Sequence, residues 1–193
     1  KVIEYITKNS KSVSGDKITQ VATISANNDV ELGNTIGEAF KMVDETGVVV
    51  MEINDQPKTK VELIDGVQYD KGLTSNNFMT DKTRGIAELN NPLVLIVESH
   101  IENIRKIQPV LEYVIKHNES LLIIADVDRQ VMNALAMNKI KGNIKINIIN
   151  APTYGVSKAE TLSDLCLLTG AKLINEDLGD DMNIIQPDYL GRC

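Results

Sequence analysis

Aromatic side chains are scarce in this 193-residue sequence, which has no tryptophan, two phenylalanines and five tyrosines. Proteins that bind single-stranded nucleic acid stack bases on aromatic rings, so this scarcity disfavours such a platform. The net charge also disfavours nucleic-acid binding, because 27 acidic residues against 20 basic ones give the chain a formal charge of -7. We therefore expect neither nucleic acid nor an anionic membrane as the main partner.

Cysteine is rare, and long apolar runs are missing. Cys166 lies in an apolar helical pattern and Cys193 is the last residue, so the two provide no disulfide framework, as is typical of a reducing compartment. No apolar run approaches the ~20 residues of a membrane-spanning helix. The sequence begins inside an amphipathic helical pattern rather than with a signal peptide. We interpret it as a fragment of a longer protein from the cytoplasm or an organelle matrix.

Short apolar runs alternate with helical patterns in the second part of the sequence. Strands are predicted at Leu93–Val97 and Leu121–Ala125, which are apolar at every position, as in strands buried on both faces. A third strand is predicted at Ile144–Ile149 and a short fourth at Lys172–Ile174. Helices are predicted between them, over Glu102–Lys116, Arg129–Lys141 and Lys158–Thr169. This alternation predicts an α/β layered fold across residues 85–175, followed by an acidic end from Glu176 to Asp181 that trails off.

Residues 1–64 indicate a smaller α+β unit. Asp29 is placed to cap a helix over Val30–Thr46, and Gly47 is placed to end it. Strands are predicted at Val48–Ile53 and Thr59–Ile64, with a turn over residues 54–57 between them.

Two positions mark helix starts near the predicted strands. Pro109 lies inside the helical pattern of Glu102–Lys116, so either the helix kinks there or a new helix starts with Pro109 in its first turn. Asp128 is placed to cap the helix over Arg129–Lys141, and Gly142 to end it.

The helix over Arg129–Lys141 has more apolar residues than one core-facing side needs. Val131 and Leu135 form one stripe, while Met132, Ala136 and Met137 lie on another part of the helix. One interpretation is a well-buried helix. The other is an exposed apolar groove, lined by flexible methionine, that takes up apolar segments of other proteins. The pattern leaves both open.

Common catalytic motifs are absent from the sequence. It has no phosphate-binding loop, no Gly-x-Gly-x-x-Gly and no Gly-x-Ser-x-Gly, and His100 and His117 are too far apart to share a metal. Asp126 and Asp128 follow a buried strand, where they could hold Mg²⁺ for a phosphotransfer enzyme. Helix capping explains the same two residues and is favoured over a metal site.

Several blocks taken together resemble the group I chaperonins, the GroEL family. They occur in the family's order and span nearly the whole chain: Val21–Asn27, Gly66–Gly72, Asn103–Arg105, Pro109–Glu112, Leu121–Ala125, Ala151–Gly155 and Leu168–Gly170. The resemblance implies that residues 1–64 are part of the intermediate domain and residues 65–193 the apical domain. It implies hinges at Gly66 and Gly191, where glycine tolerates large dihedral changes.

The resemblance also implies a function. The parent chain would form a homo-oligomeric ring and hydrolyse ATP with Mg²⁺, using catalytic parts outside this fragment. The fragment itself is therefore expected not to be an enzyme and to hold no cofactor or metal. Ile24 and Ser25 match positions beside the nucleotide, and Lys71 matches a basic residue that pairs between subunits.

The apical domain of this family binds unfolded polypeptides, and then a lid co-chaperonin, in an apolar groove between two helices. By position, the groove here comprises Leu73, Ser75, Phe78, Gln108, Leu111, Glu112, Met132, Ala136, Met137 and Asn138. The family usually has aromatics where Leu73 and Asn77 stand, and larger apolar residues where Gln108 and Ala136 stand, so this groove is smaller or more polar. We expect a molecular chaperone module. The alternatives are the phosphotransfer enzyme and a protein-binding domain with one dedicated partner.

Overall fold

The computed structural model describes residues 1–43, 47–53, 57–64, 66–69 and 71–193. The chain divides into two compact units, Lys1–Gln68 and Tyr69–Cys193. This division lies close to the domain boundary predicted after residue 64.

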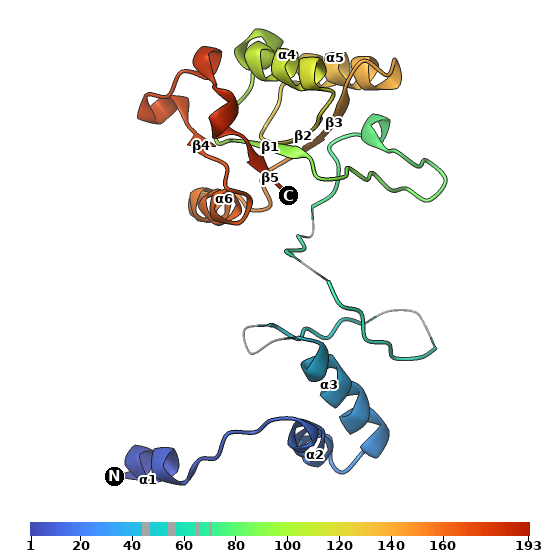
Figure 1. Cartoon of the computed structure of the whole chain (residues 1–193), viewed down its shortest axis with the longest axis vertical. Helices are drawn as coiled ribbons and strands as arrows, with labels where there is room; N and C mark the ends of the chain where they lie inside the picture. The colour runs from blue at the N-terminus through green and yellow to red at the C-terminus, as the bar shows by residue number, and fades with distance from the viewer. Residues whose placement is uncertain (44–46, 54–56, 65, 70) are drawn as a thin grey trace. The chain divides into compact units, whose positions relative to one another are not determined.

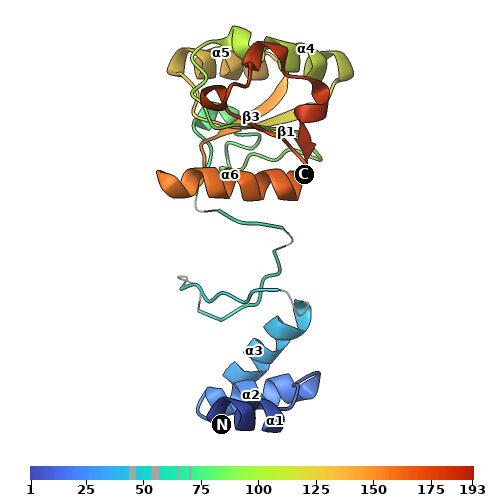
Figure 2. The same cartoon turned by 90° about the vertical axis from the view of Figure 1, so that its left-hand side faces the viewer.

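A five-stranded sheet forms the centre of the second unit (Figures 1 and 2). Its order is β3-β2-β1-β4, these four strands are parallel, and β5 pairs antiparallel with β1. The strands are β1 (Leu93–Val97), β2 (Ser120–Ile124), β3 (Lys145–Ile149), β4 (Leu173–Ile174) and β5 (Gly191–Arg192). The predicted α/β fold is confirmed.

Helices cover both faces of this sheet. The helices α4 (Gln108–His117) and α5 (Arg129–Ile140) lie side by side on one face, and α6 (Val156–Thr169) lies on the other, as both views show (Figures 1 and 2). Parallel strands need such crossover helices, which run back over the sheet between one strand and the next.

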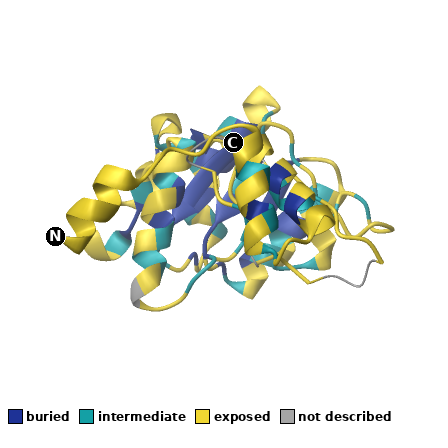
Figure 3. Cartoon of the chain, turned by 90° about the horizontal axis from the view of Figure 1, so that it is seen from below, coloured by how far each residue is buried: buried dark blue, intermediate teal, exposed yellow. Residues whose placement is uncertain are grey.

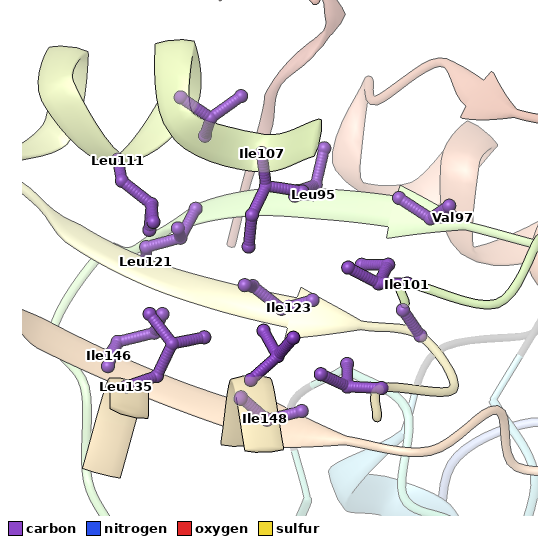
Figure 4. Close-up of a cluster of buried hydrophobic side chains, with 14 of the residues drawn as sticks. Leu95, Val97, Ile101, Ile107, Leu111, Leu121, Ile123, Leu135, Ile146 and Ile148 are labelled. Carbon is purple, nitrogen blue, oxygen red and sulfur yellow. The ribbon is translucent and has the colours of Figure 1, made fainter. Parts of the chain in front are cut away.

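The core has two layers, one on each face of the sheet. Leu93, Leu95 and Val97 of β1 belong to the larger cluster with α4 and α5, whereas Val94 and Ile96 belong to the cluster with α6. Figure 4 shows side chains of neighbouring strands meeting those of the helices in the larger cluster. Burying each aliphatic side chain contributes about 1.5–3 kcal/mol, so the two layers dominate the stability of this unit.

The predicted helix starts are confirmed. Pro109 lies in the first turn of α4, and a separate 3₁₀ helix, η2 (Ile104–Ile107), precedes it. Of the two alternatives at Pro109, a new helix is therefore the one observed. The Oδ1 atom of Asp128 accepts a hydrogen bond from the backbone N–H of Gln130 at 2.7 Å, which caps α5.

The segment after β4 is more ordered than its acidic composition predicted. It forms the 3₁₀ turns η3 (Glu176–Leu178), η4 (Met182–Ile184) and η5 (Pro187–Tyr189) before β5. Met182 and Ile185 are buried in the larger cluster, so the prediction of a trailing end is wrong. These two apolar side chains hold the segment against the domain despite the carboxylates before them.

The described part of the first unit contains three helices: α1 (Val2–Asn9), α2 (Asp16–Ser25) and α3 (Val30–Met42). Asp29 caps α3 by accepting from the N–H of Leu32 at 3.0 Å, as predicted. The helix ends at Met42, with Val43 extended, and the rest of the predicted helix, residues 44–46, lies outside the described residues. No residue of α1 is buried, and Figure 3 shows this helix in the colour of exposed residues.

The predicted strands of the first unit are not formed. The described residues 47–53 and 57–64 have no strand assignment, and residues 54–56 of the predicted turn lie outside the described residues. Most apolar side chains in these segments stay exposed, Met51 at 84% among them. A strand needs a hydrogen-bonded neighbour, and the described residues of these segments form no bridge to one another. The α+β prediction is therefore wrong for the described part of this unit.

None of the helices in the described part of the chain has the length and apolar character needed to cross a lipid bilayer.

Gly191 provides a test of the packing around β5. A Cβ atom there would lie 2.6 Å from both the backbone N of Ala171 and the backbone O of Thr169. We expect Gly191→Ala to lower the free energy of unfolding by about 2 kcal/mol or more, because backbone atoms cannot yield as a flexible side chain can. Gly72→Ala is the control, since nothing lies within 4 Å of its Cβ position. Urea unfolding curves measure both, and equal effects of the two substitutions would contradict this account.

Candidate functional site

Asp126 and Asp128 follow β2 at the carboxyl edge of the sheet, where open α/β sheets place their ligands. Asp126 pairs with His100, its Oδ2 atom 3.0 Å from Nδ1 of the imidazole, and both side chains are largely exposed. Asp128 is engaged as the cap of α5. Among the described residues, no three His, Cys, Asp or Glu side chains are arranged to hold a metal ion.

The strand order changes direction between β1 and β4, and a hydrogen-bonded network occupies the carboxyl ends of these two strands. Asn175 is buried, and its Nδ2 atom donates to Oε2 of Glu98 at 2.8 Å. Its Oδ1 atom accepts from the hydroxyl of Ser99 at 3.3 Å and from the N–H of Asp177 at 2.8 Å. The crevice that binds ligands in related architectures is thus bridged here by the protein's own side chains.

An ion pair lies beside this network. The Nζ atom of Lys106 is 2.7 Å from Oε2 of Glu176. The hydrogen bond to Glu176 is the main reason that the pKa of Lys106 is raised, and burial opposes it. The pair joins η2 to η3 and thereby holds the segment after β4 near the start of α4. Sequence periodicity gave no signal for these contacts, because they join residues about 70 positions apart.

Three of the residues predicted to line the groove are buried. Phe78, Leu111 and Ala136 are 0%, 8% and 2% exposed and belong to the larger core cluster. Figure 4 shows Leu111 extending from its helix toward Leu121 of the sheet. These side chains support α4 and α5 from beneath rather than facing solvent, which corrects the expectation that they form an exposed surface.

Other predicted groove residues are partly buried near the same cluster. Leu73 and Met132 pack against it with part of their surface exposed, and Leu73 forms an isolated bridge to Ile149 of β3. The hydroxyl of Ser75 accepts from the N–H of Asn77 at 3.3 Å and so caps the 3₁₀ turn η1 (Asn76–Phe78). The turn η1 contacts both α5 and β3, and its Phe78 is part of the core.

The remaining predicted residues lie at the surface of α4 and α5. Gln108 and Glu112 are exposed and joined by a hydrogen bond of 2.7 Å from Nε2 to Oε1. Asn138 is half-buried and donates to the carbonyl of Ala134 at 2.9 Å. Met137 is 54% exposed.

Two exposed apolar residues of these helices were not among the predicted groove residues. Ile115 of α4 is 54% exposed and Ile140 of α5 is 59% exposed. Ile140 lies one turn after Met137 on the same side of α5, because residues three apart are neighbours on a helix. The three-residue spacing of Met137 and Ile140 could have predicted Ile140 as a neighbour of Met137 at the surface. The polar residues Asn138 and Lys139 between them made this pattern hard to recognise.

Lys139 fastens η1 to α5 and β3. Its ammonium group donates to the carbonyl of Phe78 and to Oδ1 of Asn147, each at 2.5 Å, and lies 5.8 Å from the centre of the Phe78 ring. Asn147 is a buried polar residue of β3, 4% exposed. Burial lowers the pKa of Lys139. Phe78 is therefore held in position by Lys139, whose ammonium group is partly removed from water and is hydrogen-bonded to the buried amide of Asn147.

The other residues named by the chaperonin resemblance belong to other segments of the chain than α4 and α5. Ile24 and Ser25 end α2 and are exposed. Lys71 lies over the ring of Tyr154, with its Nζ atom 4.7 Å from the ring centre. Gly66 has a φ of +105°, which favours glycine, and Gly191 is buried against the end of α6.

Two apolar hollows lie among the described residues of the first unit. One, of about 410 Å³, lies between α3 and the extended segments of residues 48–53 and 59–63. The other, of about 600 Å³, is lined mainly by α2 and α3 with Val13 and Met51. Glu52, Lys60 and Glu62 also line the first hollow, and the Nζ atom of Lys60 is 3.3 Å from Oε2 of Glu62.

No model of a known protein family matches the chain. The chaperonin resemblance therefore rests on the sequence blocks alone.

The contact between Lys139 and Asn147 can be tested by a double-mutant cycle. Lys139→Met leaves the amide of Asn147 buried without its donor, and we expect a loss of about 1–3 kcal/mol in the free energy of unfolding. Adding Asn147→Leu should recover part of that loss, because no buried amide then remains unpaired. Urea unfolding of the wild type, both single variants and the double variant measures the coupling. Strictly additive effects would show that the two side chains do not depend on each other.

The lowered pKa of Lys139 gives a pH dependence with a definite sign. Between its folded pKa and the ordinary value of 10.5, the unfolded chain holds a proton that the folded chain has lost. Stability rises with pH where the unfolded state binds more protons. The free energy of unfolding of the wild type minus that of Lys139→Met should therefore rise as pH approaches 10.5 and stay flat near neutral pH. A flat or falling difference in alkaline solution would contradict the burial of this ammonium group.

Proposed function

We propose that the chain is a polypeptide-binding module of the group I chaperonin type. It holds unfolded or misfolded segments on the α4–α5 surface, which we define as Gln108, Glu112, Ile115, Met132, Met137 and Ile140. The observation that carries the proposal is that two neighbouring helices expose three large apolar side chains, each more than half exposed: Ile115, Met137 and Ile140.

The energetics of this surface suit weak and unselective capture. Burying the part of these three side chains that is still exposed, slightly more than half of each, would contribute about 2–5 kcal/mol, before the cost of association is subtracted. The attraction has no direction and requires no particular sequence, and methionine adapts its shape to different partners. One module is therefore a weak binder. Several modules that act on one client in a ring would raise the overall affinity through their high effective concentration.

The proposed contacts differ from those that family position alone implies. Phe78, Leu111 and Ala136 act as the support for α4 and α5, while Ile115 and Ile140 join Met137 as contacts. The fixed support keeps both helices in place when a client binds, so little ordering of the module itself opposes binding.

The proposal places this module within a longer parent chain. The parent would supply the ATP and Mg²⁺ site, the ATPase activity and the homo-oligomeric ring, and a lid co-chaperonin would compete with clients for the α4–α5 surface. In that assembly Lys71 would pair between subunits, Ile24 and Ser25 would lie near the nucleotide, and Gly66 and Gly191 would join the two domains.

One observation favours a second candidate, a binding domain with one dedicated partner. Gln108 and Glu112 place a hydrogen-bonded polar pair on α4 next to the exposed apolar residues. A polar pair within an apolar surface favours partners that match it, which narrows the range of clients.

The experiment compares two glutamate substitutions at exposed apolar positions. Met137→Glu places a charge on the α4–α5 surface, whereas Leu167→Glu places one on α6, where Leu167 is 84% exposed on the opposite side of the sheet. The ligand is a fluorescently labelled globular protein that is kept unfolded by reduction and carboxymethylation. We expect Met137→Glu to weaken binding at least ~10-fold and Leu167→Glu to leave it unchanged. Fluorescence anisotropy gives the dissociation constants.

Circular dichroism and urea unfolding establish that both variants keep the fold. Equal binding by the wild type and Met137→Glu would reject the α4–α5 surface as the client site. A panel of several unfolded proteins separates the two candidates, because a chaperone module binds most of them and a dedicated domain ignores them.

A further inference from the structure

Carboxylates are absent from α5, although the chain as a whole is acidic. From Arg129 to Lys141 the sequence has three basic residues and no Asp or Glu, in a chain with 27 acidic and 20 basic residues. The neighbouring helix α4 has one acidic residue, Glu112, which is hydrogen-bonded to Gln108. The exposed charges of α5 itself are therefore basic, although two carboxylates precede the helix: Asp126, which pairs with His100, and the half-buried capping residue Asp128.

The charges on α5 stand at its two ends. Arg129 starts the helix and Lys141 follows its last residue, and both are exposed. Twelve residues of helix separate them by about 18 Å along the axis. Within the described part of the chain, neither forms an ion pair. The exposed side chains of Met137 and Ile140 lie between them, together with the uncharged Asn133.

We infer that this face of α5 selects polypeptide segments that carry carboxylates on both sides of an apolar centre. The inference rests on the proposed function and names the class of client that the α4–α5 surface prefers. The span between Arg129 and Lys141 sets the size of the segment. About 18 Å corresponds to carboxylates some five or six residues apart in an extended segment, or about twelve apart in a helix.

A polypeptide fits this face better than the other anionic ligands. Stable attachment to an anionic membrane needs a cluster of several basic residues and a deeper apolar face, and α5 offers two separated charges and two exposed apolar side chains. A nucleic acid would need a continuous basic stripe or stacking rings, and α5 has no aromatic residue. A peptide with an apolar centre and acidic residues on both sides matches the apolar middle of α5 and its two basic ends.

The local charges can act despite the acidity of the whole chain. At physiological ionic strength the Debye length is about 8 Å, so charges elsewhere on the module are largely screened from a ligand on α5. Asp128, beside Arg129, is half-buried and engaged in the cap of α5, so Arg129 and Lys141 are the exposed charges of α5 that a bound segment meets. The preference for acidic segments should consequently weaken as salt is added, while the apolar part of the binding persists.

The test uses three labelled peptides of equal length with the same apolar centre, flanked on both sides by Glu, Gln or Lys. Anisotropy titrations are made with the wild type, with Arg129→Gln/Lys141→Gln, and with Lys82→Gln/Arg84→Gln as a control of equal charge change. Lys82 and Arg84 are exposed and lie in the loop before β1. We expect the wild type to bind the Glu peptide on the order of 5-fold more tightly than the Lys peptide. The α5 variant should lose this preference and the control should keep it.

The outcomes separate the inference from the proposed function. Equal binding of the three peptides to the wild type would overturn the inference and leave the proposed function standing. If none of the peptides binds, while the unfolded protein is not captured either, both are overturned. Vesicles of anionic phospholipid are titrated in parallel. Vesicle binding that depends on Arg129 and Lys141, without a preference among the peptides, would assign the face to lipid and overturn the inference.

Discussion

The strand β1 can be buried only if both faces of the sheet are covered, and the rest of the second unit follows from this constraint. All five residues of Leu93–Val97 are buried, and alternate side chains enter different core layers. The α4 and α5 helices must cover one layer and α6 the other. Every helix residue that faces the sheet is then committed to the core, Leu111 among them, and only the outer sides of the helices remain for binding.

The fold was predictable where the signals are local. The unbroken apolar run of Leu93–Val97 and the capping position of Asp128 each depend on a few neighbouring residues, and both were predicted correctly. Pairing of the extended segments in the first unit depends on another strand, which local patterning does not specify. For the same reason the contribution of Gly191 to β5, opposite Val94 of β1, was not foreseen.

The candidate site was predictable only in part. The periodicity of a sequence predicts which positions of a helix are apolar, but it does not predict which other element covers them. Ala136 and Met137 are adjacent in the sequence, and 2% of one and 54% of the other is exposed. They point about 100° apart around the helix axis. The buried side of α5 includes its contact with η1, a turn about sixty residues earlier that is held by Lys139. No local sequence pattern predicts such a contact between distant residues.

The same division of α5 explains how one helix can serve stability and binding together. Its inner side is fixed by the sheet and by η1, so substitutions there alter the free energy of unfolding first. Its outer side contributes little to the core, and residues there can be apolar or basic without loss of stability. In the last turn of α5 the helix dipole favours basic residues, and Lys139 holds η1, but neither reason applies to Arg129 in the first turn, where an acidic residue would be more favourable. An exposed basic residue at an end of the helix where stability does not favour it indicates a role in binding at this surface.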